Sequence, residues 1–279
     1  MSISEKLTAI AQNTPRVYEA GKKVSYEDGF GAGYTQGKSH GYTKGEAAGK
    51  QAEYDRFWDS FQENGTRKSY HCAFAGSCWT PQTFKPKYPI KPVDTSSTTR
   101  YGAFMFYYFG RGQKGTKGFT PCSITPDIVD FSECINVRFA FNNAWFDEVT
   151  ADFGNATSLE HTFALGDGGG GIRKLNLRVT EKITAFTNTF GYASPLVELT
   201  FTDDSVIAGS IDLKWSTNLS LDSGKSILKT IKDYSGTANE DKYTVSLPGE
   251  LWEKLDADGE TSPTGGTWKQ FIEQKGWTY

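Results

Sequence analysis

Five acidic residues lie in a stretch of sequence where carboxyl groups could work in pairs. They are Asp127, Asp130, Asp147, Glu148 and Asp152. Two carboxyl groups roughly 5 to 9.5 Å apart across a cleft carry out glycoside hydrolysis. Turns between the units of a repeat protein are also rich in solvated Asp, so the pattern by itself does not identify an enzyme. We expect no catalytic residue and keep a glycan hydrolase as a second alternative.

Aromatic residues are the second group with chemical potential. Tyr and Trp bring a large contact area at low entropic cost and can stack on sugar rings. The candidates for a ligand-binding surface are Tyr101, Tyr107, Tyr108 and Trp145, with Trp79 and Phe146 as further nominees. Phe146 also fits the core of a repeat, and Trp79 fits a cap. For Tyr107 and Tyr108, core packing and ligand binding both stay open.

The cysteines and histidines do not predict a metal site. Structural zinc needs close Cys or His pairs, whereas the three histidines are scattered. Four cysteines are too few for a disulfide scaffold in a chain of 279 residues. Bridges from Cys72 to Cys78 and from Cys122 to Cys134 stay open, although Cys134 takes the place of Ala156 in the next unit and is better explained as a small core residue. We expect no metal and no cofactor.

The elements that must position these groups repeat. Three stretches have apolar residues at i, i+3 and i+5 and follow one another at roughly two dozen residues. They are Phe146, Val149 and Ala151; Ile172, Leu175 and Leu177; and Leu196, Leu199 and Phe201. A unit that begins L-x-x-L-x-L cannot bury its own apolar face, so each unit must stack on the next. The spacing predicts short parallel strands with Val149, Leu175 and Leu199 in one buried row.

The segments that follow Asp130 and Asp152 also match each other. Both run from Asp-Phe through an aliphatic residue to a final Phe, at Phe141 and Phe163, and Phe190 ends the following segment in the same way. Two patterns in phase favour an irregular leucine-rich-repeat-like solenoid over residues 120–217. The alternative is an ordinary β-rich domain with chance periodicity.

The N-terminal segment, residues 1–65, has glycine at every fourth position. These glycines are Gly29, Gly33, Gly37, Gly41, Gly45 and Gly49. Each costs an isolated helix about 0.8 to 1 kcal/mol relative to alanine, so a helix here needs another backbone close by. One interpretation is a helical stalk in which several copies, most simply three, pack through the glycines. The other is a flexible tether. Good helix formers at 46–61 favour the helix, and we assign the segment to docking or oligomerisation.

Two atypical segments flank the repeats. Residues 66–119 are aromatic and Pro-rich, and the prolines at 81, 86, 89 and 92 exclude a regular helix, so we expect an N-terminal cap. Residues 218–279 predict a C-terminal α/β cap with a helix over 222–236, a strand over 242–247 and helical faces at 251–255 and 268–272. The predicted fold class is therefore α+β: a glycine-rich helical segment, a solenoid with short parallel strands, and this cap.

Composition argues against several functional classes. The net charge of −3 gives no electrostatic reason to expect nucleic acid, whose phosphates dominate binding. No apolar run approaches the roughly 18 residues needed to cross a bilayer, so we expect no membrane insertion. The first seven residues lack the charged and then apolar order of a secretory signal, and we expect no signal peptide.

Several blocks of the chain carry a resemblance to known proteins. They are the start Met1-Ser-Ile-Ser-Glu-Lys-Leu, the block Gln51-Ala-Glu-Tyr-Asp-Arg-Phe-Trp-Asp, the blocks Ala73-Phe-Ala-Gly and Phe84-Lys-Pro-Lys-Tyr with Trp79, and the ending Gly266-Thr-Trp-Lys with Lys275-Gly-Trp. In these the chain resembles an uncharacterised family of phage and prophage tail-region proteins of gut Firmicutes, over most of its length. The middle is similar to BspA-type leucine-rich repeats of bacterial surface proteins, with more Phe and fewer Leu. The resemblance supplies no catalytic residues.

From these observations we expect a non-enzymatic virion structural protein, of the tail-tip or fibre type, that presents a host-recognition surface. It would be made in the bacterial cytoplasm and assemble, as a homo-oligomer with a trimer favoured, with other tail proteins. Its ligand would be a glycan or protein of the host cell surface. The first alternative is a bacterial cell-surface leucine-rich-repeat adhesin, which the missing export signal disfavours. The second is a tail-spike-like glycan hydrolase.

Overall fold

The computed structural model describes residues 4, 73–75, 84, 86, 89–93, 102–110, 121–165, 171–193, 195–258 and 262–279. The predictions for the glycines at 29–49, for Trp79 and Tyr101, and for Cys72 and Cys78 lie outside the described residues.

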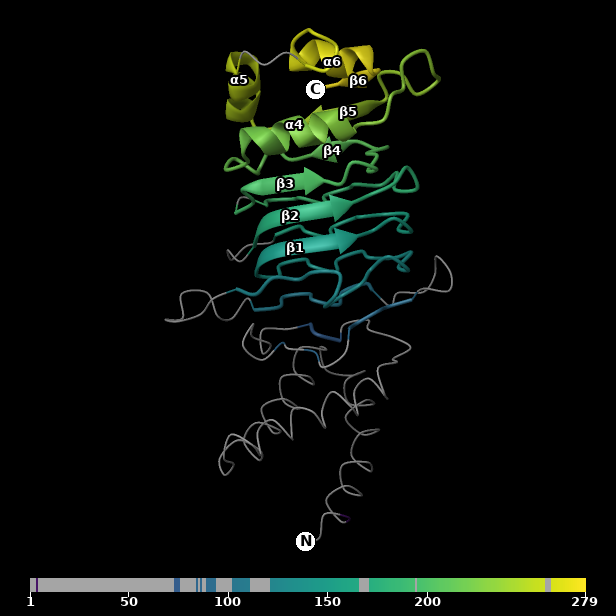
Figure 1. The fold of residues 1–279 in the computed structure, drawn as a ribbon, viewed down its shortest axis with the longest axis vertical. Helices are drawn as coiled ribbons and strands as arrows, with labels where there is room; N and C mark the ends of the chain where they lie inside the picture. Colours follow the sequence, from purple (N-terminus) through teal and green to yellow (C-terminus); the bar gives the residue numbers. More distant parts are fainter. Residues whose placement is uncertain are drawn as a thin grey trace.

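Three strands form a parallel sheet in the order β1-β2-β3 (Figure 1). They are β1 (Phe146–Asp152), β2 (Ile172–Arg178) and β3 (Glu198–Phe201). In the register of this sheet Val149 lies opposite Leu175, and Leu175 lies opposite Leu199. All three side chains are buried, so the predicted row is confirmed. Because successive strands pair in parallel with their apolar positions in register, the apolar face of one unit is covered by the next.

A second ladder runs beside the sheet, through the segments that return the chain from one strand to the next. Isolated parallel bridges join Asn136 to Ser158 and Ser158 to Ala185. The backbone N–H of Phe141 donates to the carbonyl of Thr162 at 2.9 Å. Corresponding residues of successive units therefore lie one above another on this side as well.

The final Phe of each matched segment belongs to a column of stacked rings. The rings of Phe106, Phe141, Phe163 and Phe190 follow one another with centroids 5.2, 5.4 and 5.9 Å apart. All four are buried. Stacked pairs contribute about 0.5 to 1.5 kcal/mol beyond their burial, which explains why these units use Phe where Leu is usual.

The C-terminal part combines helices with a second parallel sheet, in the order β4-β5-β6. Its elements are β4 (Ile211–Asp212), α4 (Leu221–Thr230), β5 (Tyr243–Ser246), α5 (Gly249–Ala257), α6 (Trp268–Gln274) and β6 (Trp277–Thr278). The predicted helical faces are confirmed, since Leu251 and Leu255 of α5 and Trp268, Phe271 and Ile272 of α6 are buried.

Helix α4 lies along the free edge of β3 (Figure 1). An uncovered edge strand would leave backbone N–H groups without partners. The hydroxyl of Ser223 accepts from the N–H of Leu199 at 2.8 Å, and that of Ser226 accepts from the N–H of Phe201 at 3.2 Å. Serines on one face of α4 thus replace the next strand and end the first sheet.

The prediction that this helix extends to Gly236 is wrong, because α4 ends at Thr230. Ile231 instead forms a parallel bridge with Ile207. The N–H of Ile207 donates to the carbonyl of Thr230, and the N–H of Lys232 donates to the carbonyl of Ile207, both at 2.9 Å. Hydrogen bonding to the preceding unit is thus favoured over another turn of helix. Helix propensity depends on local residues alone, so it could not predict this end point.

One hydrophobic cluster extends from Ala73 to Trp277. It crosses both predicted boundaries, 119/120 and 217/218, so the units on either side share a core. Helices that could cross a membrane, by length and apolarity, are absent from the described ranges.

Candidate functional site

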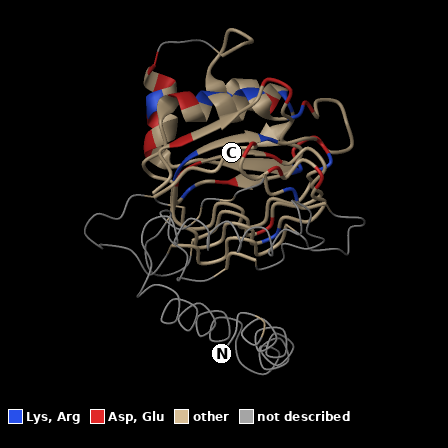
Figure 2. Ribbon diagram, turned by 60° about the horizontal axis from the view of Figure 1, so that its bottom comes forward, with Lys and Arg blue, Asp and Glu red and all other residues tan. Residues whose placement is uncertain are grey.

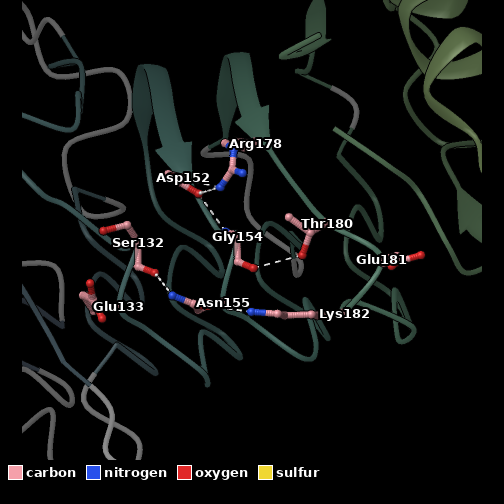
Figure 3. A pocket seen from close by; sticks show the side chains of 9 residues that line it. All are labelled: Ser132, Glu133, Asp152, Gly154, Asn155, Arg178, Thr180, Glu181 and Lys182. Atoms are coloured by element: carbon pink, nitrogen blue, oxygen red, sulfur yellow. Dashed lines mark hydrogen bonds and ion pairs between the residues drawn. The ribbon is translucent and has the colours of Figure 1, made fainter. Parts of the chain in front are cut away.

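A polar groove lies at the carboxyl ends of β1 and β2 and has a volume of about 400 Å³ (Figure 3). Its lining residues are Ser132, Glu133, Asp152, Gly154, Asn155, Arg178, Thr180, Glu181 and Lys182. Asp152 and Arg178 are the last residues of their strands and are register partners. Strand pairing therefore places a carboxylate beside a guanidinium at the head of the groove.

Arg178 is held between two carboxylates. Its Nη1 lies 3.2 Å from Oδ1 of Asp152, and its Nε lies 2.7 Å from Oδ2 of Asp204. The hydrogen bonds to Asp204 and then Asp152 raise the pKa of Arg178. A hydrogen bond from the Thr202 hydroxyl, and then the bond from Arg178, lower the pKa of Asp204. The guanidinium is thus fixed in position, although such half-exposed pairs add only about 0 to 1 kcal/mol to stability.

The floor of the groove joins three successive units through side chains (Figure 3). Asn155 Nδ2 donates to the carbonyl of Ser132 at 2.8 Å, and Lys182 Nζ donates to Asn155 Oδ1 at 2.8 Å. The hydroxyl of Thr180 donates to the carbonyl of Gly154 at 2.9 Å. These bonds link residues 23 to 27 positions apart in the chain, so their first effect is to hold the stack together.

Gly154 is required by the close approach of Arg178. Its N–H donates to Oδ1 of Asp152 at 2.7 Å. A Cβ atom at this position would lie 2.2 Å from Nη1 of Arg178 and 3.0 Å from Oδ1 of Asp152. A side chain at this position would displace the guanidinium, so glycine leaves the space that Arg178 occupies.

Three of the five carboxylates that suggested hydrolysis, Asp130, Asp147 and Asp152, are paired with basic side chains. Asp130 lies 3.2 Å from Lys91 and accepts from the N–H of Ser132 at 2.9 Å. Burial raises the pKa of Asp130, but the bonds from Ser132 and the charge of Lys91 outweigh this and lower it. Asp147 lies 3.5 Å from Arg173. A glycosidase needs one carboxyl group with a raised pKa as its acid, so Asp130 is unsuited to that role.

Three of the four predicted ligand-binding aromatics are described. The rings of Tyr107 and Tyr108 are half-buried and contact each other edge-on, with centroids 4.2 Å apart. The N–H of Tyr108 donates to the carbonyl of Asn142, and the N–H of Trp145 donates to the carbonyl of Phe109 at 2.8 Å. The backbone therefore brings Tyr108 and Trp145 to adjacent units, and whether they bind a ligand stays a prediction.

A column of half-buried aromatic rings beside these residues was not predicted. Phe104 stacks on Phe139 at 4.7 Å, and Phe139 stacks on His161 at 4.8 Å. All three have a positive φ of 55° to 58°, a strained backbone for bulky residues. Each precedes a Phe of the buried column by two positions. Alignment of the units on that Phe would have found the aromatic position from the sequence.

No disulfide joins Cys122 and Cys134, so the bridge between them that the sequence left open is not formed. Burial raises the pKa of Cys122 to about 12, which makes it a poor nucleophile at neutral pH. Cys134 is buried like Ala156 in the next unit, as predicted. Within the described ranges no three His, Cys, Asp or Glu residues gather as a metal site would require.

Comparison with known protein families, curated proteins and solved structures finds no match to this chain. The geometry of the described residues is thus the ground for a functional proposal.

Proposed function

We propose that the protein is a non-enzymatic recognition protein of a phage tail, built on a leucine-rich-repeat-like solenoid. The observation that supports this is the common register of β1, β2 and β3. A stack in parallel register repeats each sequence position as a row on the surface. Solenoids use extended surfaces of this kind to bind partners.

The state of the charged groups favours binding over catalysis. Arg178 is paired with Asp152 and Asp204, and Asp130 is paired with Lys91. Groups held in this way are rigid and already neutralised, which makes them unsuited to proton transfer. Asp127 and Glu148 form no ion pair with a described residue, so the hydrolase alternative would have to rest on these two.

The placement in a virion rests on the resemblance to tail-region proteins. In this proposal residues 1–65 dock to other tail proteins and join three copies, and the stacked units face the host cell. The bacterial adhesin remains the alternative, since the same surface would serve it. The two differ in whether the protein is part of a particle.

Binding to intact bacteria tests the recognition role. Fluorescently labelled full-length protein is incubated with a panel of gut Firmicutes, and we expect saturable binding to some strains that excess unlabelled protein abolishes. The same mixtures are assayed for reducing sugar, and we expect none to be released. The proposal would be contradicted if the protein bound none of the strains. It would also be contradicted if the protein released sugar and an Asp130→Asn, Asp147→Asn, Asp152→Asn triple variant did not.

Two measurements test the virion setting. Mass spectrometry of particles purified from a strain that carries the gene is expected to detect the chain, and its restriction to the cell envelope would favour the adhesin. Light scattering of the full-length chain is expected to give a trimer. Replacement of both Gly37 and Gly41 by Leu should yield monomers, because bulky side chains would prevent the close packing that the stalk interpretation requires. If the unaltered chain were a monomer, the result would instead support the interpretation of the glycine-rich segment as a flexible tether.

A further inference from the structure

A second groove, of about 350 Å³, lies between the return segment at 184–188 and strands β4 and β5. Its lining residues are Thr184, Ala185, Phe186, Thr187, Asn188, Ser210, Ile211, Asp212, Tyr243, Thr244 and Ser246. Six of these eleven carry a hydroxyl group. A wall of this composition offers many hydrogen bonds and little charge.

Several of these polar groups are available to a ligand. The side chains of Thr184, Thr187 and Asn188 are exposed and form no hydrogen bond with another described residue. Backbone geometry holds Asn188 rigidly, because its carbonyl accepts from the N–H of Gly191 and its φ is 50°. The rim therefore presents exposed donors and acceptors that no described residue occupies.

Two exposed aromatic rings stand next to this groove. Tyr192 and Trp215 are 63% and 48% exposed and stack with centroids 5.2 Å apart and planes inclined by 26°. The face of a large aromatic ring in water is a costly surface that a flat apolar partner can cover. This pair is a platform, which we call the Tyr192–Trp215 platform.

Lys214 connects the groove with the platform. Its ammonium lies 2.8 Å from Oδ2 of Asp212, which lines the groove, and 5.9 Å from the centroid of the Trp215 ring. Asp212 Oδ1 also accepts from the N–H of Lys214 at 3.1 Å. The two charges neutralise each other, and Figure 2 shows acidic and basic residues interleaved in the same way over the C-terminal part. The site therefore has no net charge with which to select an ion.

We propose that this groove and the Tyr192–Trp215 platform together bind a neutral oligosaccharide. A sugar ring has an apolar face of C–H groups and a rim of hydroxyls, so it can stack on Trp215 or Tyr192 while its hydroxyls bond to Thr187, Asn188 and Asp212. The proposal deepens the recognition role above and rests on it, because it names the site and the ligand class. A folded protein partner would need a larger apolar surface than two rings.

The test is binding of the full-length protein to an array of immobilised oligosaccharides of two to eight units. The array holds neutral hexose, N-acetylhexosamine and deoxyhexose chains, with sialylated and phosphorylated counterparts. We expect binding to a subset of the neutral chains. Trp215→Ala should weaken it roughly tenfold, the upper end of one aromatic stacking contact. Thr187→Val, which removes one hydroxyl and keeps the shape, should weaken it about threefold.

A second aromatic pair provides the matched control. Tyr279 is exposed, packs against Trp252 at 5.6 Å and has Lys269 over its ring, but neither aromatic lines the groove. Tyr279→Ala should leave oligosaccharide binding unchanged. Each variant is checked by thermal unfolding, and we expect no change for these exposed positions.

The outcomes separate the two proposals. Absence of binding to every neutral chain, a preference for the charged counterparts, or binding that Trp215→Ala and Thr187→Val leave intact would overturn the site. If the protein still bound cells, and protease but not periodate treatment of the cells removed that binding, the recognition role would stand with a protein ligand. If cells were not bound while the array result held, the site would stand and the recognition role would fall.

Discussion

The two grooves of this molecule use similar residues in opposite ways. In the groove at the ends of β1 and β2, Asn155 and Lys182 bond to neighbouring units and Arg178 is held by two carboxylates. In the groove beside β4, the side chains of Thr187 and Asn188 are exposed and bond to no residue that the structure describes. The polar side chains of the first groove hold the stack together, whereas those of the second groove are open to a ligand.

The length of the units also differs between the two grooves. Register partners are 26 positions apart in β1 and β2, at Phe146 and Ile172, but 34 positions apart in β4 and β5, at Ile211 and Val245. Units of similar length bring polar side chains opposite each other, and they pair. In the second groove the return segment at 184–188 lies opposite strands β4 and β5, and its two exposed threonines form no side-chain hydrogen bond with a described residue.

The largest effect is expected beneath the first groove. Leu175→Ala removes a side chain from the centre of the buried row and should lower the free energy of unfolding by about 2 to 5 kcal/mol. The matched control is Lys174→Ala, one residue away, which breaks only the half-exposed pair with Glu198 and should cost about 0 to 1 kcal/mol. Urea unfolding measures both. Equal losses of unfolding free energy in the two variants would mean that the buried row does not stabilise the stack.

Gly154→Ala tests the close packing of the first groove. The added Cβ would meet the end of the Arg178 side chain, so we expect a loss of up to about 2 kcal/mol in unfolding free energy as the guanidinium shifts and its two ion pairs weaken. Gly249→Ala is the control, because a Cβ at that position in the first turn of α5 meets no atom within 4 Å. It should be neutral or stabilise by up to about 1 kcal/mol. If Gly154→Ala did not lower the unfolding free energy, Arg178 could move aside at no cost.

Asn155→Ala should separate stability from binding. It removes the bonds to Ser132 and Lys182, and we expect a cost of about 1 to 2 kcal/mol by urea unfolding. Oligosaccharide binding should not change, since the two grooves share no lining residue. Thr187→Val should do the reverse, with stability altered by less than about 0.5 kcal/mol. Loss of binding in Asn155→Ala would contradict the division of roles.

The smallest effect concerns acid stability. The pKa of Asp204 is lowered in the folded chain by the Thr202 hydroxyl and Arg178. A lowered pKa means stability that is present above the unfolded value, about 3.9, and is lost as pH falls through the folded value. The melting temperature of Asp204→Asn should therefore be below that of the unaltered chain at pH 6, and the gap should close towards pH 2. A constant gap would contradict this assignment.

Much of the sheet β1-β2-β3 could be predicted because the apolar spacing that specifies it is local in the sequence. Alternation and the i, i+3, i+5 spacing specify which residues of a strand face inward, and stacking follows from their recurrence. The buried row, the place of Cys134 and the helical faces of α5 and α6 needed nothing more. Asp152 was among the carboxylates singled out, but its bond to Arg178 depends on the register of two strands, which the spacing only implied.

The tertiary structure alone decided the features that depend on competition between units. Helix α4 ends at Thr230 because Ile207 offers Ile231 a better partner than another helical turn. Tyr192 and Trp215 are 23 positions apart and stack in the folded chain, with both rings left exposed. Sequence by itself determined the repeat, since burial of one apolar face per unit is a local demand. Which polar and aromatic groups are left open depends on what the neighbouring unit covers, and only the folded stack shows that.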